Sequence, residues 1–164
     1  FFETLFSSTI SVGYMLLITG ILIYLSEKYS NVKIDLNSMK THNAIIVGIA
    51  QGLAIIPGIS RSGSTIVSSL LQGLDRESAA KYSLLISIPV ILGAGLIEVK
   101  DVIEEGMNIS WSYLLIGGLV SAISGYFAIK YLLRVLRRGS LKIFSYYCWI
   151  VGLLIIIISG IIMS

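Results

Sequence analysis

Four long apolar segments constrain the fold of this chain more than any other feature. They lie at about residues 9–26, 82–99, 111–133 and 143–163, and each approaches the ~20 apolar residues that a membrane-spanning helix needs. Only 13% of the 164 residues are charged, whereas about a quarter of a typical soluble domain is charged. The sequence therefore predicts an all-α, multi-pass protein of the cell membrane, with a single membrane domain over residues 1–164 and no nucleic-acid partner.

Residues 43–73 form an apolar stretch of a different kind, because Pro57 and Gly58 interrupt it. Neither half reaches the ~20 residues required to cross the hydrocarbon. Two interpretations follow: one broken span, or a re-entrant hairpin of two half-helices.

The distribution of basic residues separates these two interpretations. Three linkers are basic, and basic linkers lie in the cytoplasm. The basic residues are Lys28, Lys33 and Lys40 after the first span, Arg76 and Lys81 after the broken stretch, and Arg134, Arg137, Arg138 and Lys142 before the last span. All three linkers share one side only if residues 43–73 enter and leave by the same face. We therefore expect a hairpin whose tip lies deep in the membrane, with both chain termini outside.

Small residues recur at helical spacing in three places, and such faces let helix backbones approach closely in lipid. The three faces are Ala44, Gly48 and Gly52; Thr65, Ser69 and Gly73; and Gly117, Ser121 and Gly125. We expect the first two faces to pack the half-helices inside protein. The third face is compatible with an internal contact or with a homodimer.

The tip of the hairpin has the composition of an anion site. An arginine in a membrane segment is energetically costly and marks function more often than not. Ser60 or Ser62 can cap the second half-helix, Gly63 permits close backbone approach, and Arg61 offers a planar fork to phosphate oxygens. The candidate substrate-binding residues are Gly58, Ser60, Arg61, Ser62 and Gly63. The alternative is that Arg61 pairs with a carboxylate on a neighbouring helix.

The segment Gln-Gly-Leu-Ala-Ile-Ile-Pro-Gly-Ile-Ser-Arg-Ser-Gly-Ser-Thr at residues 51–65 resembles the second signature of the undecaprenyl pyrophosphate phosphatase family, the bacitracin-resistance type. Residues 17–23, Glu27, 73–80 and 82–89 also resemble that family, and the likeness runs from about residue 6 to the C-terminus. The resemblance implies a membrane enzyme that hydrolyses a polyprenyl diphosphate to the monophosphate with a divalent cation, Mg or Ca. Such enzymes recycle the lipid carrier for peptidoglycan and similar glycans.

The resemblance also implies a fold of two inverted repeats, each with a re-entrant helix pair. Carried onto this sequence, it places Ser60, Arg61 and Thr65 in the catalytic site, with Arg61 holding the diphosphate.

One departure from the family pattern is important. The family's first signature, rich in glutamate, serine and histidine, is not found in this chain. The only histidine, His42, lies in a basic linker, and the carboxylates lie in linkers or near an interface, while the lone Cys148 is expected to be a buried, unreactive thiol. We therefore expect the C-terminal portion of a longer protein, holding neither metal ligands nor a catalytic base, and inactive or nearly so by itself.

Other classes of protein share part of this pattern. A transporter or flippase for an anionic lipid or solute also uses half-helix N-termini at the midplane. A histidine-dependent lipid phosphatase fits poorly, because Ile66 and Val67 stand where its nucleophile is needed. A structural subunit with an internally paired Arg61 is the third alternative.

Overall fold

The structure, a computed structural model, describes residues 9–29, 34–106, 110–138 and 140–163, and within them it is all helix and turn apart from one isolated bridge. The elements are α2 (Thr9–Tyr29), the short 3-10 helix η1 (Leu36–Ser38), α3 (Thr41–Leu53), α4 (Arg61–Leu71), α5 (Arg76–Glu104), α6 (Trp111–Arg138) and α7 (Lys142–Met163). Helices α2, α5, α6 and α7 are long and apolar enough to span a membrane. The predicted fold class and its four spans are therefore confirmed, and the chain is a multi-pass membrane protein.

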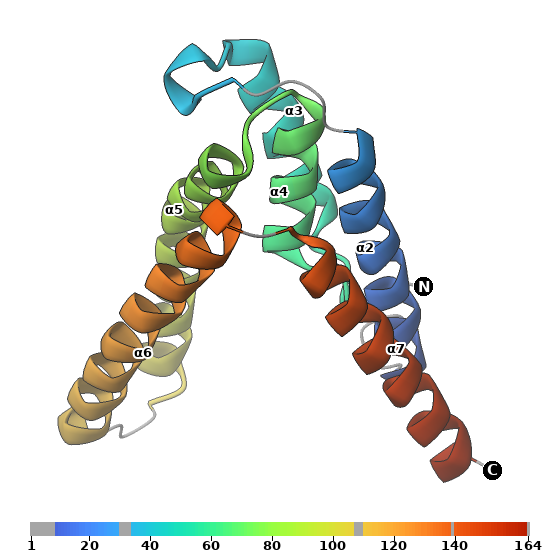
Figure 1. The fold of residues 1–164 in the computed structure, drawn as a ribbon. Helices are drawn as coiled ribbons and strands as arrows, with labels where there is room; N and C mark the ends of the chain where they lie inside the picture. The colour runs from blue at the N-terminus through green and yellow to red at the C-terminus, as the bar shows by residue number, and fades with distance from the viewer. Residues whose placement is uncertain (1–8, 30–33, 107–109, 139, 164) are drawn as a thin grey trace.

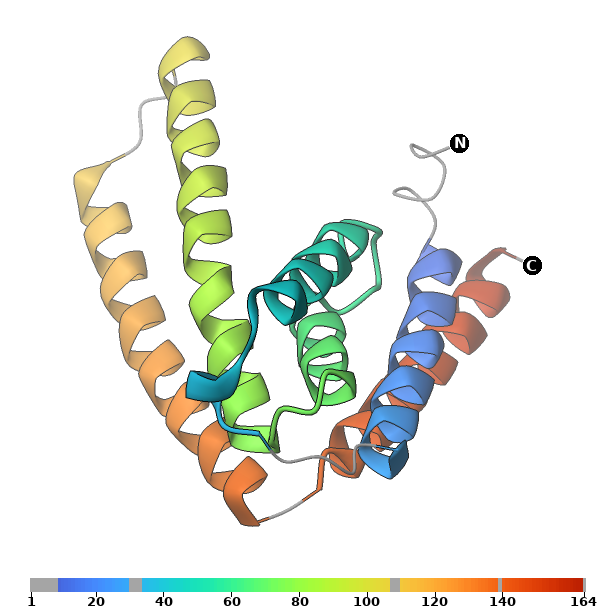
Figure 2. The same ribbon diagram turned by 90° about the horizontal axis from the view of Figure 1, so that it is seen from above.

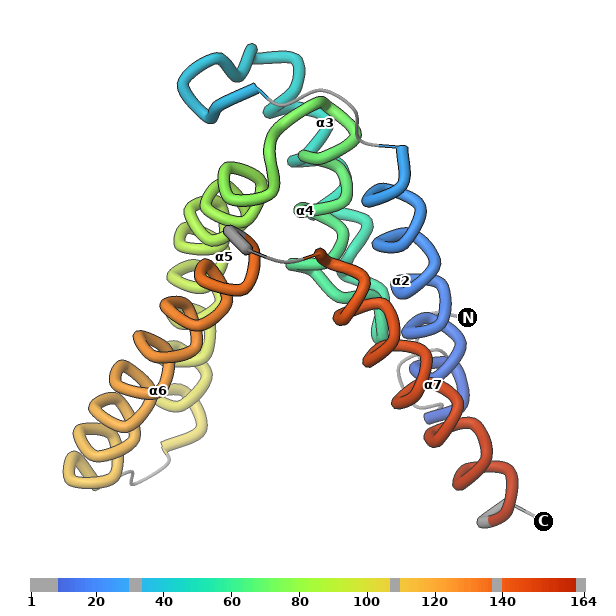
Figure 3. The backbone as a smooth tube through the Cα atoms, in the orientation of Figure 1, coloured from blue at the N-terminus to red at the C-terminus, as the bar shows by residue number. Residues whose placement is uncertain are grey.

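The long helices form two arms that converge at one end and spread apart at the other (Figures 1 and 2). One arm pairs α2 with α7, and the other pairs α5 with α6. The end of α2, the start of α5 and the α6–α7 connection lie at the convergent end. The tube in Figure 3 shows α3 and α4 between the arms, running in opposite directions.

Helix α3 begins and helix α4 ends at this convergent end. Ile34 N–H donates to Gly73 O at 2.9 Å, and Asp75 N–H donates to Ile34 O at 3.1 Å, so the linker before α3 pairs with the turn after α4. The Asn43 carboxamide also donates to Gln72 O at 3.3 Å. Residues 43–73 therefore form the expected hairpin and not a single crossing.

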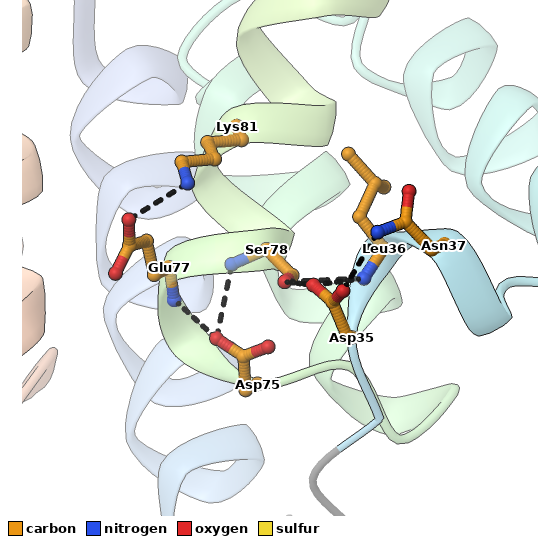
Figure 4. Close-up of polar contacts among 7 residues, drawn as sticks. All are labelled: Asp35, Leu36, Asn37, Asp75, Glu77, Ser78 and Lys81. Carbon is orange, nitrogen blue, oxygen red and sulfur yellow. Dashed lines mark hydrogen bonds and ion pairs between the residues drawn. The ribbon is translucent and has the colours of Figure 1, made fainter.

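A polar network fixes the linker to the start of α5 (Figure 4). The Asp35 carboxylate accepts from Leu36 N–H at 2.7 Å and from the Ser78 hydroxyl at 3.1 Å. Asp75 caps α5 by accepting from the Glu77 and Ser78 N–H groups. The base of the hairpin is thus held by the side chains of Asp35 and Ser78 as well as by backbone pairing.

A partly buried ion pair joins α2 to α5 at the same end. Arg76 Nε donates to Glu27 Oε2 at 3.0 Å, and a second guanidinium nitrogen bonds Glu27 Oε1. The Glu27 side chain is only 4% exposed. Removing Arg76 would leave the buried Glu27 carboxylate without its counter-charge, which is destabilising.

Helix α4 is the most enclosed element of the molecule, since it contacts α2, α3 and α5. The predicted small-residue face of Thr65, Ser69 and Gly73 is buried, as expected. The prediction for α3 is wrong: Gly48 and Gly52 face open space, and the face that packs carries Asn43 and Val47. Because α3 contacts α4 alone among the helices, only one side of α3 is covered.

Helices α2 and α7 approach each other through glycines that the sequence analysis did not identify. A Cβ atom at Gly13 would lie 3.0 Å from Gly152 O, and one at Gly20 would lie 2.6 Å from the Trp149 ring. In contrast, Gly117 and Gly125 of α6 have no atom of another residue near their Cβ positions. The described part of the chain therefore makes no internal contact through the third small-residue face.

We expect Gly20→Ala to lower the thermal midpoint of unfolding in detergent, because the added methyl group collides with Trp149. Overpacking of this kind typically costs about 1–3 kcal/mol. Gly95→Ala in α5 is the matched control, since its Cβ would meet open space, and a helical Gly→Ala change there should stabilise by roughly 0.5–1 kcal/mol. Equal midpoints for the two variants would contradict the tight α2–α7 contact.

The polar network also predicts a pH dependence. Hydrogen bonds from Leu36 N–H and next from Ser78 lower the pKa of Asp35 below its usual 3.8. A depressed carboxyl pKa contributes stability above the unfolded pKa and loses it as pH falls through the folded value. Unfolding midpoints measured between about pH 5 and pH 3 should therefore fall less for Asp35→Asn than for wild type. Asp101→Asn, at an exposed carboxylate with no hydrogen bond to a described residue, should behave as wild type.

Candidate anion-binding site at the hairpin tip

The tip of the hairpin is a compact turn that packs against α2. Helix α3 ends at Leu53, and Pro57 and Gly58 lie within the turn that follows. Gly58 has φ +87°, and a Cβ there would lie 2.7 Å from Val12 Cα. Glycine is required at residue 58 for both reasons, since other residues rarely adopt this backbone conformation.

The turn places the start of α4 near the middle of a membrane span. A Cβ at Gly63 would lie 3.1 Å from Thr19 Cγ2, and Thr19 is midway between Thr9 and Tyr29 of α2. The first turn of α4 is therefore level with the centre of α2, as expected for a re-entrant hairpin.

Ser60 is the cap of α4, which decides between the two predicted serines. Its hydroxyl accepts from Gly63 N–H at 3.1 Å and lies 3.3 Å from Ser62 Oγ. The N–H groups of Arg61 and Ser62 have no acceptor among the described residues. Free N–H groups and the helix dipole give this end of α4 a partial positive charge.

The Arg61 side chain adds a full charge at the same place. It is half-buried, and no carboxylate in the described ranges lies within ion-pair distance of it. The alternative in which Arg61 pairs with a carboxylate is therefore not what the structure shows for these residues. A partly desolvated guanidinium without a counter-ion favours the binding of an anion.

Thr65 lies one turn further along α4, and its side chain is fully buried. Its hydroxyl is 2.6 Å from Ser83 Oγ on α5 and within 3.1 Å of the Arg61 and Ser62 carbonyls. The structure therefore brings together Gly58, Ser60, Arg61, Ser62 and Gly63 at the tip, and it places Thr65 in the α4–α5 contact behind them.

Gln51 is a tip residue that the sequence analysis did not single out. It occupies the last turn of α3, and its Oε1 atom is buried without a hydrogen-bond partner in the described part of the molecule. An unsatisfied buried acceptor costs about 1–3 kcal/mol. The signal in the sequence was its position as one of two carboxamides, with Asn43, in this apolar half-helix.

Acid–base and metal-binding groups are found elsewhere in the described residues. His42 is exposed at the start of α3, at the opposite end of the hairpin from the tip. No three or more His, Cys, Asp or Glu side chains cluster in the parts of the chain that the structure describes. Serine hydroxyls and one carboxamide do not match the carboxylate-rich sets that hold Mg²⁺ or Ca²⁺. The residues present at the tip therefore do not fit a divalent cation by themselves.

Comparison with known proteins bears on this arrangement. The family described as "Bacitracin resistance protein BacA" matches residues 1–154. The chain is 62% identical over 162 residues to an undecaprenyl-diphosphatase of Halothermothrix orenii, covering 98% of this chain and 62% of that relative. It is 50% identical over 157 residues to an undecaprenyl-diphosphatase of Methanosphaera stadtmanae, covering 96% of this chain and 56% of the relative.

A third undecaprenyl-diphosphatase, from Methanothermobacter thermautotrophicus, is 48% identical over 159 residues and is covered over 87% of its length. The chain thus spans somewhat more than half the length of the first two relatives and most of the third. A family match over nearly the whole sequence, together with relatives of this similarity, shows that the chain belongs to the BacA bacitracin-resistance family.

Proposed function

We propose that the hairpin tip binds the diphosphate head of a polyprenyl lipid, and that the complete protein hydrolyses this lipid to the monophosphate. The observation that carries the proposal is the unpaired Arg61 guanidinium at the N-terminus of α4, level with the centre of α2. The names of three relatives, all undecaprenyl-diphosphatases, supply the substrate and the reaction. The product would re-enter the lipid-carrier cycle of glycan synthesis.

Each tip residue has a separate role in this proposal. Arg61 donates in a planar fork to phosphate oxygens, and the free N–H groups of Arg61 and Ser62 donate to the same anion. Ser60 orients the first turn through its cap on Gly63. Gly58 sets the sharp turn against Val12, so its contribution is to the shape of the site. In the low-dielectric surroundings of a membrane protein such donors bind phosphate more strongly than in water.

Hydrolysis requires groups that the tip does not contain. Transfer of a phosphoryl group to water needs a proton acceptor beside the phosphate. The resemblance places such groups in a first signature that this chain does not have. We therefore propose that the 164-residue chain binds the lipid diphosphate, and that the acid–base groups and the ligands of the implied cation lie outside it.

The membrane orientation and the oligomeric state are part of the same proposal. Arg76 and Arg134 lie toward the convergent end, which we place in the cytoplasm, so that both termini lie outside. The exposed glycine face of α6, at Gly117 and Gly125, is the surface through which two copies would pack in a homodimer.

We expect Arg61→Ala to weaken binding of a polyprenyl diphosphate by about 10–100-fold, the effect of losing hydrogen bonds to a charged group. The measurement is equilibrium binding of labelled lipid diphosphate to the purified chain in nanodiscs. Arg134→Ala on α6 is the matched control, since it removes an equal charge from an exposed residue away from the tip. The polyprenyl alcohol should bind equally to wild type and to Arg61→Ala.

Equal affinity in Arg61→Ala and wild type would overturn the anion site.

The hydrolytic part of the proposal has its own test in the intact protein that contains this chain. Phosphate release that is lost on Arg61→Ala supports the enzyme. Movement of intact lipid diphosphate across the bilayer without phosphate release would instead identify a transporter.

The structure also predicts how Thr65 acts. Thr65→Val leaves the Ser83 hydroxyl buried without its partner, so we expect a loss of about 1 kcal/mol in unfolding free energy. Thr65→Val with Ser83→Ala should recover most of this loss, because both polar groups are then removed. If Thr65 acts only through this hydrogen bond, phosphate release by the intact protein should recover together with stability. If Thr65 also contacts the substrate, the double variant should recover stability but not phosphate release.

A further inference from the structure

The Gln51 carboxamide is the exception among the amide side chains of the described residues. Asn37 donates to Asp35 at 2.9 Å, and Asn43 and Gln72 bond each other across the base of the hairpin at 3.3 Å. Gln51, the only other described carboxamide, has no side-chain hydrogen bond, and its Oε1 atom is buried. A polar group that is left unpaired inside a folded protein requires an explanation, and a ligand contact is one.

The position of Gln51 on α3 directs it toward α4. Residues 43, 47 and 51 are four apart and therefore share one face of the helix. Asn43 bonds Gln72 at the end of α4, and Val47 is fully buried in the hairpin. Gln51 continues this face into the last turn of α3, after which the chain turns and α4 begins at Arg61.

We propose that Gln51 is a further substrate-contacting residue of the anion site, whose amide N–H groups donate to the terminal phosphate. This proposal rests on the diphosphate function proposed above. The carboxamide has two N–H donors that no described residue uses. It lies in the last turn of α3, on the face that packs against α4, and the chain then turns into the start of α4, where Arg61 and Ser62 offer free N–H groups. No hydrogen bond to a described residue holds the carboxamide, and in this proposal it rotates on binding so that its N–H groups, and not Oε1, face the phosphate.

A ligand contact and a structural role predict opposite effects on stability. Gln51→Leu replaces an unpaired carboxamide by an apolar side chain of similar length, so the folded state loses an unsatisfied group and no hydrogen bond. Gln72→Leu makes the same chemical change at the other end of the hairpin, where it breaks the bond to Asn43. The two substitutions therefore form a matched pair, with Gln72 outside the proposed site.

The test measures equilibrium binding of labelled polyprenyl diphosphate and the thermal midpoint, for the purified 164-residue chain in nanodiscs. Gln51→Leu should weaken binding of the diphosphate roughly tenfold, as expected for one hydrogen bond to a charged group, with a midpoint no lower than that of wild type. Gln72→Leu should lower the midpoint and keep wild-type affinity. The polyprenyl alcohol, which lacks the phosphates, should bind both variants and wild type equally.

Two results would overturn the role of Gln51 while leaving the proposed function intact. One is wild-type affinity in Gln51→Leu beside weakened binding in Arg61→Ala. The other is a loss of affinity in Gln51→Leu that is matched by Gln72→Leu or by a fall in the midpoint. A wild-type chain without saturable binding, or an Arg61→Ala chain that binds as tightly as wild type, would instead overturn the proposed function together with this inference.

Discussion

The enclosure of a half-helix within protein is the constraint on which the rest of this structure depends. Helix α4 has eleven residues, too few to span the hydrocarbon, so the helix begins inside the membrane. Backbone groups at that depth are tolerated only where protein or an aqueous cavity surrounds them. Helices α2, α3 and α5 provide that cover, and the Thr65–Ser83 hydrogen bond fixes α4 against α5.

The two ends of the hairpin are stabilised in different ways. At the base, the Ile34–Gly73 pairing, the Asp35–Ser78 hydrogen bond and the Glu27–Arg76 ion pair satisfy the polar groups of α2, the linker and α5. At the tip, the Arg61 side chain and the Gln51 carboxamide have no partners among the described residues. Well-satisfied polar groups give rigidity, whereas an unpaired charge inside a membrane protein is a candidate site for a ligand.

The path of the chain could be predicted because it follows from composition and charge. Basic linkers at one side required a hairpin at residues 43–73, and the serines before Gly63 indicated a helix start in the right place. The side-chain surroundings were predicted less well. The stripe of Gly48 and Gly52 suggested a packed face, yet α3 packs through Val47, because small residues permit close approach without requiring it.

In the candidate site, too, the contacts between side chains could not be predicted from local sequence patterns. The resemblance placed Thr65 in the catalytic site, and that role stays a prediction, while its hydrogen bond to Ser83 on α5 is a contact that the sequence alone does not show. A role for Gln51 could not be predicted, because a carboxamide in an apolar half-helix indicates a site only when its hydrogen-bond partners are known. The contact between Gly20 and Trp149 joins segments 129 positions apart, which no local pattern relates (149 − 20).

The sequence by itself determined which segments cross the membrane, which one turns back, and where a helix begins beside an arginine. These properties depend on segment length, linker charge and capping residues, all of which are local. Only the tertiary structure decided that Arg61 has no carboxylate partner among the described residues, that Thr65 is buried, and that the Gln51 side chain has no hydrogen bond there. The physical reason is that pairing and burial depend on which distant helices meet, and helix packing in lipid follows from shape across the whole bundle.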